Sequence, residues 1–218
     1  MKYKHILWDW NGTLLDDMWL CVESLNRILK KRERPPLDEK TYKETFSFPV
    51  KKYYETLGFD FKKESFRDLS SEFIKYYRDN FYKLKLHANA ECILKKINNN
   101  KIQQSILSAS KQDILEENIK FFNLEKYFNN IVGVKNHYAN GKVDVAFQLV
   151  EAIKTKSSDI LLIGDTVHDS EVAKEIESDC ILIDHGYVDR GKLEHTKRKV
   201  FSNIMEVIDH INSKRSFI

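Results

Sequence analysis

The chain has 218 residues, of which 42% are hydrophobic and 32% are charged, a balance typical of a globular protein with a sizeable core. Lysine and arginine outnumber aspartate and glutamate by 36 to 33, and a net charge of +3 is too small to indicate a nucleic-acid or membrane partner. The cysteines, Cys21, Cys92 and Cys180, are scattered and form no CxxC pair, which argues against a disulfide framework or a zinc site. No signal-peptide or membrane-spanning pattern is present, so we expect a cytoplasmic protein.

The first apolar run, Ile6-Leu7-Trp8, ends at Asp9, and so short a run predicts a buried strand. No strand-like run follows from about residue 16 to about residue 85. That stretch carries two helical stripes of apolar residues, separated by a charged segment and Pro35-Pro36. We therefore predict that residues 16–85 form an all-helical insertion, joined through two adjacent linkers, with Asp16 and Asp17 at the hinge.

Four further apolar runs follow the insertion, and each ends at a polar residue or a glycine. They precede Ser108, Gly133, Gly164-Asp165 and Asp184, and helical stripes alternate with them. Alternating strands and helices predict an α/β fold with a doubly wound, Rossmann-like parallel sheet, formed by residues 1–15 and 86–218. Ligands of such sheets bind beyond the carboxyl ends of the strands, where these polar residues are expected.

Asp9 opens the motif with the clearest chemical meaning. It ends the first strand and is followed by Gly12-Thr13, so its carboxylate and the backbone N–H groups of the turn are placed to meet a phosphate or another anion. An aspartate that merely caps a strand-to-helix turn would give the same pattern. This motif alone does not decide between the two interpretations.

Three further signals favour a catalytic site. Ser108 can donate a hydrogen bond to a phosphoryl oxygen, and Lys142, which opens a helix after Gly141, can neutralise an anion. Asp165 and Asp169 follow the most apolar strand, and two such acids can ligate a hard divalent cation. A helix cap, a surface lysine and a solvated acid pair are the ordinary alternatives for each signal alone. Their order along successive strands makes the combination specific. His168, between the two acids, is expected to be an exposed loop residue.

In this combination the sequence resembles the haloacid dehalogenase superfamily over its whole length. The family's four motifs are Asp-x-Asp-Gly-Thr, a Ser or Thr, a Lys, and Gly-Asp-x-x-x-Asp, and they match residues 9–13, Ser108, Lys142 and residues 164–169. The helical insertion after the first motif resembles the family's type 1 cap, as in phosphoglycolate phosphatases and β-phosphoglucomutases.

The resemblance implies that a small phosphorylated metabolite is hydrolysed through a covalent aspartyl intermediate on Asp9. It implies a Mg²⁺ ion bound by Asp9, the backbone carbonyl of Asn11 and Asp165, with Asp169 in support. The implied catalytic set is Asp9, Asn11, Ser108 and Lys142, and the implied phosphate contacts are Trp10, Asn11, Ser108, Ala109 and Lys142.

Asn11 departs from the family pattern. Phosphatases of the family carry an aspartate there as the general acid and base, a role typically worth about 10²–10⁴-fold, and an amide cannot perform it. Three hypotheses stay open. The first is a phosphohydrolase whose leaving group needs no protonation, or whose acid comes from the cap or the substrate. The second is a catalytically weak anion- and metal-binding regulatory protein, and the third is another covalent chemistry on Asp9, such as dehalogenation or phosphoryl transfer. The family's dehalogenases generally work without magnesium, so the acid pair weighs against dehalogenation.

Overall fold

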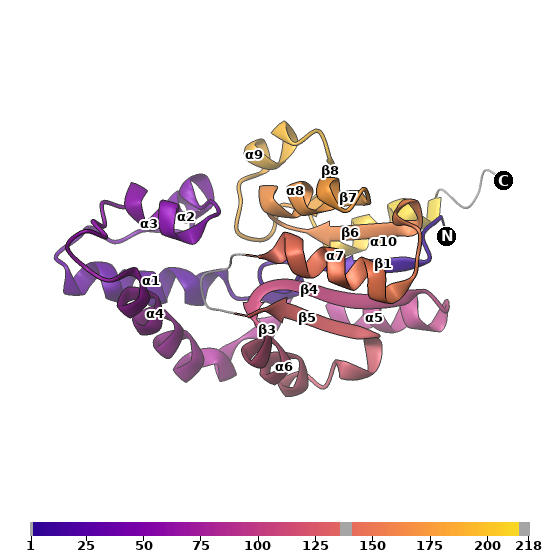
Figure 1. Cartoon of the computed structure of the whole chain (residues 1–218), viewed down its shortest axis with the longest axis horizontal. Coiled ribbons are helices and arrows are strands. Elements are labelled where there is room, and N and C mark those ends of the chain that lie inside the picture. The colour runs from indigo at the N-terminus through magenta and orange to yellow at the C-terminus, as the bar shows by residue number, and fades with distance from the viewer. Residues whose placement is uncertain (1, 136–140, 214–218) are drawn as a thin grey trace.

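The computed structural model describes residues 2–135 and 141–213, and its larger part is a parallel six-stranded sheet in the order β5-β4-β1-β6-β7-β8 (Figure 1). These strands are β1 His5–Trp8, β4 Gln103–Lys111, β5 Asn130–Val134, β6 Ile160–Gly164, β7 Asp179–Ile183 and β8 Lys199–Phe201. The strands β1 and β6 are fully buried, because helices cover both faces of the sheet. The predicted α/β fold with a Rossmann-like parallel sheet is confirmed.

Helices connect successive strands of the sheet. They are α5 Ala90–Asn99, α6 Gln112–Phe121, α7 Lys142–Ile153, α8 Val167–Glu175, α9 Arg190–His195 and α10 Ile204–Ser213, with 3₁₀ turns at Glu125–Tyr127 and Ser157–Asp159. Helix α5 packs against α10, and α7 packs against α8. Right-handed crossovers place the first pair on one face of the sheet and the second pair on the other (Figure 1).

Two details of the sheet differ from the expectation. Strand β8 was not expected, because it has only three residues, Lys-Val-Phe, and directly follows the basic residues Lys197 and Arg198. Strand β4 continues to Lys111, so Ser108 lies within it. The register between β4 and β5 shifts between Leu107 and Lys111, and this irregularity falls beside the site.

The chain between β1 and β4 forms a separate helical layer. It comprises α1 Met18–Lys31, α2 Glu39–Thr45, α3 Val50–Thr56, α4 Phe66–Asn80 and a 3₁₀ turn at Phe81–Lys83. Helices α1 and α4 pack together, and the layer lies beyond the carboxyl ends of the strands (Figure 1). At its base, β2 Leu15–Asp16 pairs antiparallel with β3 Lys85–Leu86. This pairing supports our proposal that residues 16–85 form a cap on a core of residues 1–15 and 86–218.

The sheet topology brings the motif residues together. Strand β1 lies between β4 and β6, and the chain leaves this point in both directions, which makes it the topological switch point where α/β sheets bind ligands. Asp9, Ser108 and Asp165 follow or belong to these three adjacent strands. Among the described residues, no helix combines the length and apolar character needed to cross a bilayer.

Candidate active site

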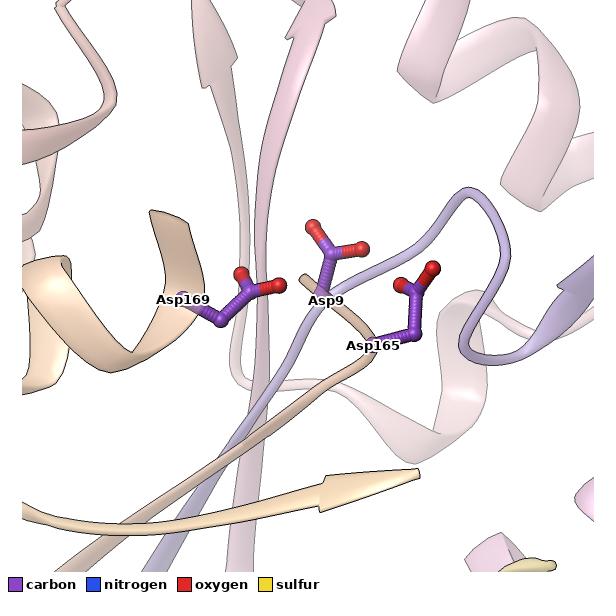
Figure 2. Close-up of side chains that lie close together, drawn as sticks. All are labelled: Asp9, Asp165 and Asp169. Atoms are coloured by element: carbon purple, nitrogen blue, oxygen red, sulfur yellow. The ribbon is translucent and has the colours of Figure 1, made fainter. Parts of the chain in front are cut away.

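Three aspartates from two strand ends and one helix meet at the switch point. Asp9 follows β1, Asp165 follows β6, and Asp169 lies in the first turn of α8. One carboxylate oxygen from each lies within 4.8 Å of the others (Figure 2). Asp9 is 6% exposed and the other two are fully buried. So dense a group of buried acids requires compensation by a cation or by protons.

Two glycines make room for these acids. At Gly12, which has φ of +76°, an added Cβ would lie 2.4 Å from Oδ2 of Asp165. At Gly164, an added Cβ would lie 2.3 Å from Cγ of Asp169. Any larger residue would displace a carboxylate, so both motif glycines are explained by the close approach of backbone to acid.

The start of α8 orients Asp169. Thr166 is the N-cap, its hydroxyl accepts from the Asp169 N–H, and Oδ2 of Asp169 accepts from the Thr166 backbone at 3.0 Å and from the Thr166 hydroxyl at 2.7 Å. This capping box holds one oxygen of Asp169 at the helix terminus. The other oxygen is left to face Lys142.

Lys142 supplies the cation of the site. It is the first residue of α7, after Gly141 with φ of +89°, and its ammonium is buried. Its Nζ donates to Oδ1 of Asp9 at 2.5 Å and to Oδ1 of Asp169 at 2.6 Å. Burial lowers the pKa of Lys142, but the two carboxylates outweigh it and the net shift is upward. The lysine therefore stays charged.

The pKa values of the three aspartates are shifted by different amounts and in different directions. Burial, followed by the charges of Asp9 and Asp169, holds the pKa of Asp165 well above its usual range, although it accepts from the Thr13 hydroxyl and the Tyr187 N–H, each at 2.7 Å. Burial also raises the pKa of Asp9 to about 7, against the pull of Lys142. For Asp169, burial raises the pKa, but Lys142 and Thr166 reverse the shift and hold it below its ordinary value.

The charges of the site fit a divalent cation. Three carboxylates, when ionised, face one ammonium, which leaves two negative charges uncompensated. The donor set consists of hard carboxylate oxygens, which Mg²⁺ prefers. Asp9 and Asp165, which favour protonation here, are the acids from which a bound cation would displace protons.

Asn11 is held by hydrogen bonds at both ends of its amide. Its Oδ1 accepts from the Ser110 hydroxyl at 2.6 Å and from the Ser108 hydroxyl at 3.5 Å. Its Nδ2 donates to Oδ2 of Asp17 at 2.7 Å and to the Tyr77 hydroxyl at 3.2 Å. The amide is thus oriented by core serines on one side and by the hinge and the cap on the other.

Asp17 is the main residue of this region whose contacts the sequence did not reveal. It is fully buried and accepts at Oδ2 from the hydroxyls of Tyr77 at 2.6 Å and Tyr187 at 2.7 Å, besides Asn11. Its Oδ1 accepts from the Gly12 N–H at 3.0 Å. Burial raises the pKa of Asp17, and these donors oppose the shift. A buried acid in the hinge could be anticipated as unusual, but its partners could not.

A cavity of about 170 Å³ opens between the cap and the carboxyl ends of the strands. It is lined by Asp9, Asn11, Ser108, Ala109, Lys142 and Asp169 among the residues named from the sequence. The Trp10 side chain is elsewhere: it is fully buried and packs edge-on against Phe122, with ring centroids 6.1 Å apart. Only the backbone of Trp10 serves the site, through a hydrogen bond to Asp9.

His168 differs from the expectation of an exposed loop residue. It belongs to α8 and is half-buried, because its ring packs at a tilt of 35° against Phe48 of the cap, with centroids 5.0 Å apart. The helix begins at Val167, immediately after the capping residue, so no loop remains at this position.

A family model for the haloacid dehalogenase-like hydrolases matches residues 6–183, which is most of the chain. The chain belongs to this family. It is therefore a hydrolase of the haloacid dehalogenase-like type, and the predicted resemblance is confirmed. Among curated proteins, a candidate pyrophosphatase, PpaX, from Caldanaerobacter subterraneus subsp. tengcongensis is 21% identical over 170 residues, covering 78% of this chain and 76% of that protein.

Solved structures share the fold along nearly the whole chain. A haloacid dehalogenase-like hydrolase from Streptococcus pneumoniae superposes with a TM-score of 0.84 at 19% identity, covering 96% of this chain and 99% of that one. A protein described as a predicted phosphatase from Clostridium acetobutylicum superposes with a TM-score of 0.80 at 22% identity, covering 97% of this chain and 99% of that one. A predicted phosphoglycolate phosphatase from Haemophilus somnus superposes with a TM-score of 0.79 at 15% identity, covering 97% of this chain and 99% of that one. At these identities the likeness concerns the fold.

Proposed function

We propose that the hydrolase is a phosphatase that cleaves small phosphate monoesters through a covalent aspartyl phosphate on Asp9. The observation that carries the proposal is the single buried ammonium of Lys142 shared between Asp9 and Asp169, next to Asp165 and open to a cavity. Relatives described as phosphatases support the reaction class.

Asp9, Lys142 and Ser108 have separate roles in this reaction. An Asp9 oxygen attacks phosphorus, and the bond from phosphorus to the leaving oxygen breaks, with its electron pair going to that oxygen. Lys142 and the Ser108 hydroxyl offset charge on the transferring group. Water then attacks the aspartyl phosphate, which frees inorganic phosphate and restores Asp9.

Asp9, Asp165 and the backbone carbonyl of Asn11 would hold Mg²⁺, with Asp169 in support. When bound, Mg²⁺ would neutralise charge around the phosphoryl group and orient it. The remaining negative charge of the aspartate group supports this assignment, because an anionic substrate would otherwise enter a site of the same sign.

The fixed amide of Asn11 favours a substrate whose leaving group departs without a proton from position 11. Its nitrogen already donates to Asp17 and Tyr77, and an amide carries no titratable proton. Phenolic and acyl phosphates are such substrates. Phosphate monoesters of ordinary alcohols should react slowly.

Formation of the aspartyl adduct tests the proposal directly. With beryllofluoride and Mg²⁺, the wild-type chain should form an adduct on Asp9, seen by fluorine NMR, and should release phosphate from 4-nitrophenyl phosphate. Asp9→Asn should do neither while keeping its circular dichroism spectrum. A wild-type protein that binds beryllofluoride but releases no phosphate would favour the binding-protein alternative.

A further inference from the structure

The charged groups that line the cavity come almost entirely from the core. Among the described lining residues they are Asp9, Asp169, Lys111, Lys142 and, from the hinge, Asp17. Lys142 is already shared by two carboxylates, and Lys111 pairs with Asp113 at 2.6 Å. Both lining cations among the described residues therefore already contact carboxylates of the protein, which weakens their attraction for a second anionic group of a substrate.

The cap side of the cavity is apolar and aromatic. It contributes Tyr42, Phe46, Phe48, Tyr53, Tyr54 and Phe73, together with aliphatic residues such as Ile74. The described cap residues that line the cavity include no lysine, arginine or histidine. Such a wall gains free energy by covering an apolar or aromatic group, but it offers a carboxylate or a second phosphate neutral hydroxyl donors and no cation.

Two cap cations, Lys43 and Arg34, are engaged elsewhere. Lys43 Nζ donates to the Asp184 carbonyl at 2.9 Å, and Arg34 donates to the carbonyls of Leu57 and Gly58 at 3.0 and 2.6 Å. The charged group that the hinge does present is Asp17, a carboxylate that accepts its hydrogen bonds from neutral amide, backbone and hydroxyl donors. Its charge repels an anion placed against this wall.

We propose that the organic part of the substrate is a neutral aromatic or apolar group, without a second anionic group. The inference rests on the proposed phosphatase function and adds the substrate class. It separates this chain from its relatives described as a pyrophosphatase and a phosphoglycolate phosphatase, whose named substrates each carry a further anionic group. It also agrees with Asn11, since phenolic esters are aromatic and have good leaving groups.

The size of the cavity sets the size of the group. Its volume is about 170 Å³, and a cavity of roughly 150 Å³ holds one benzene molecule. A single ring is thus the size of organic group that this cavity matches.

A matched pair of ligands tests the charge preference without relying on turnover. 4-Nitrobenzylphosphonate and 4-carboxybenzylphosphonate have nearly the same shape and differ in one negative charge, and neither can be hydrolysed. Calorimetry with Mg²⁺ and the wild-type chain should give a Kd at least about tenfold lower for the nitro compound, the scale of one unpaired charge at a partly desolvated wall. The corresponding phosphate esters show whether phosphate is released, but binding alone measures the charge preference, because the leaving groups of the two esters differ in acidity.

A charge placed on the wall should reverse the preference. Ile74→Lys, on α4 at the cavity, should tighten binding of the carboxylated phosphonate by about tenfold and weaken binding of the nitro compound, because the lysine replaces part of the apolar wall. Tyr82→Lys is the matched control, because Tyr82 is 65% exposed and does not line the cavity, and it should change neither Kd.

The outcomes separate the inference from the function beneath it. Equal or tighter wild-type binding of the carboxylated phosphonate would overturn the inference while leaving the phosphatase assignment intact. If neither phosphonate binds and no phosphate is released from either ester, the proposed function fails and the inference falls with it.

Discussion

Asn11 and Asp17 form a pair in which an amide occupies the position expected for the acid, and a carboxylate lies next to it. Their Nδ2 and Oδ2 atoms are 2.7 Å apart. An aspartate introduced at position 11 would therefore face a buried carboxylate at hydrogen-bonding distance. Two acids so close share one proton, and at least one of their pKa values rises.

This geometry predicts that Asn11→Asp alone gains less activity than the exchange Asn11→Asp/Asp17→Asn. The exchange puts the acid at position 11 and keeps an amide-to-carboxylate hydrogen bond. It should raise kcat/KM for benzyl phosphate by about 10²-fold, the scale of general acid–base catalysis. The single variant should gain less and should lose thermal stability.

The control is Asp17→Asn alone, which should show no gain. Because Asn11 precedes Gly12 and such pairs deamidate, peptide mass spectrometry must confirm position 11 in every sample. Unchanged turnover in the exchange variant, with phosphate-mimic binding retained, would favour another chemistry at Asp9.

Asp165 should be required for stabilisation by magnesium. Its pKa is raised by burial and by Asp9 and Asp169, so its ionised form costs free energy in the metal-free protein. Asp165→Asn should leave the fold intact, raise or preserve the metal-free Tm, and abolish the rise in Tm on adding Mg²⁺. Equal stabilisation by Mg²⁺ in variant and wild type would contradict the assignment.

At the scale of elements, the loop after β1 is held by two stacked histidines. His87 follows β3 and His185 follows β7, and their ring centroids lie 3.7 Å apart. His185 Nε2 donates to the Thr13 carbonyl at 3.1 Å, and His87 bonds the Gly12 backbone. The pair thus links the cap linker, the motif loop and the sheet.

Burial lowers the pKa of each histidine from 6.5 to about 4, and the His87 ring also lowers the pKa of His185. Between pH 4 and pH 6.5 the unfolded chain binds more protons than the folded chain. The histidine pair therefore makes its whole contribution to the free energy of unfolding above pH 6.5, and that contribution is lost as the pH falls toward 4. Because the rings are only half-buried, we expect the loss between pH 7 and pH 5 to be on the order of 1 kcal/mol.

Urea unfolding at both pH values measures this loss. His87→Gln/His185→Gln should reduce the pH dependence, and His195→Gln, an exposed histidine of α9, serves as the control. An unaltered pH dependence in the double variant would show that other groups cause it.

At the scale of the whole molecule, cap and core meet through contacts that a rigid-body motion could break together. Tyr187 of the core packs edge-on against Tyr42 and Phe46 of the cap, and Phe48 packs at a tilt against His168. The β2–β3 pair at the base consists of two residues on each strand, which is short enough to act as a hinge.

We predict that residues 16–85 close over bound substrate as a lid. Asp16 and Lys85 are exposed, and cleavage beside them by a protease should slow several-fold when beryllofluoride and Mg²⁺ are added. Cleavage near exposed Lys156, far along the core, should not change. A hinge cleaved at the same rate under all conditions would count against lid closure.

Local signals in the sequence determined the fold class and the site's principal residues. Strands β1 and β6 are apolar on both faces because they are buried on both, and the polar residues after them fall at one edge because the strands are parallel. Lys142 and the aspartates could be named in advance, since each follows a recognisable strand or turn. Strand β8 could not, because it has only three residues, and the length of β4 could not, because its ends are polar.

Tertiary structure alone decided the surroundings of Asn11 and the character of the cavity. Asp17 meets Tyr77 and Tyr187 across 60 and 170 residues of chain, and no local pattern encodes such contacts. The sequence also contains enough cap lysines and arginines to bind an anion. Their positions in the folded chain show that no described lysine or arginine of the cap lines the cavity. Charge complementarity depends on where the charged groups lie in space, which composition does not give.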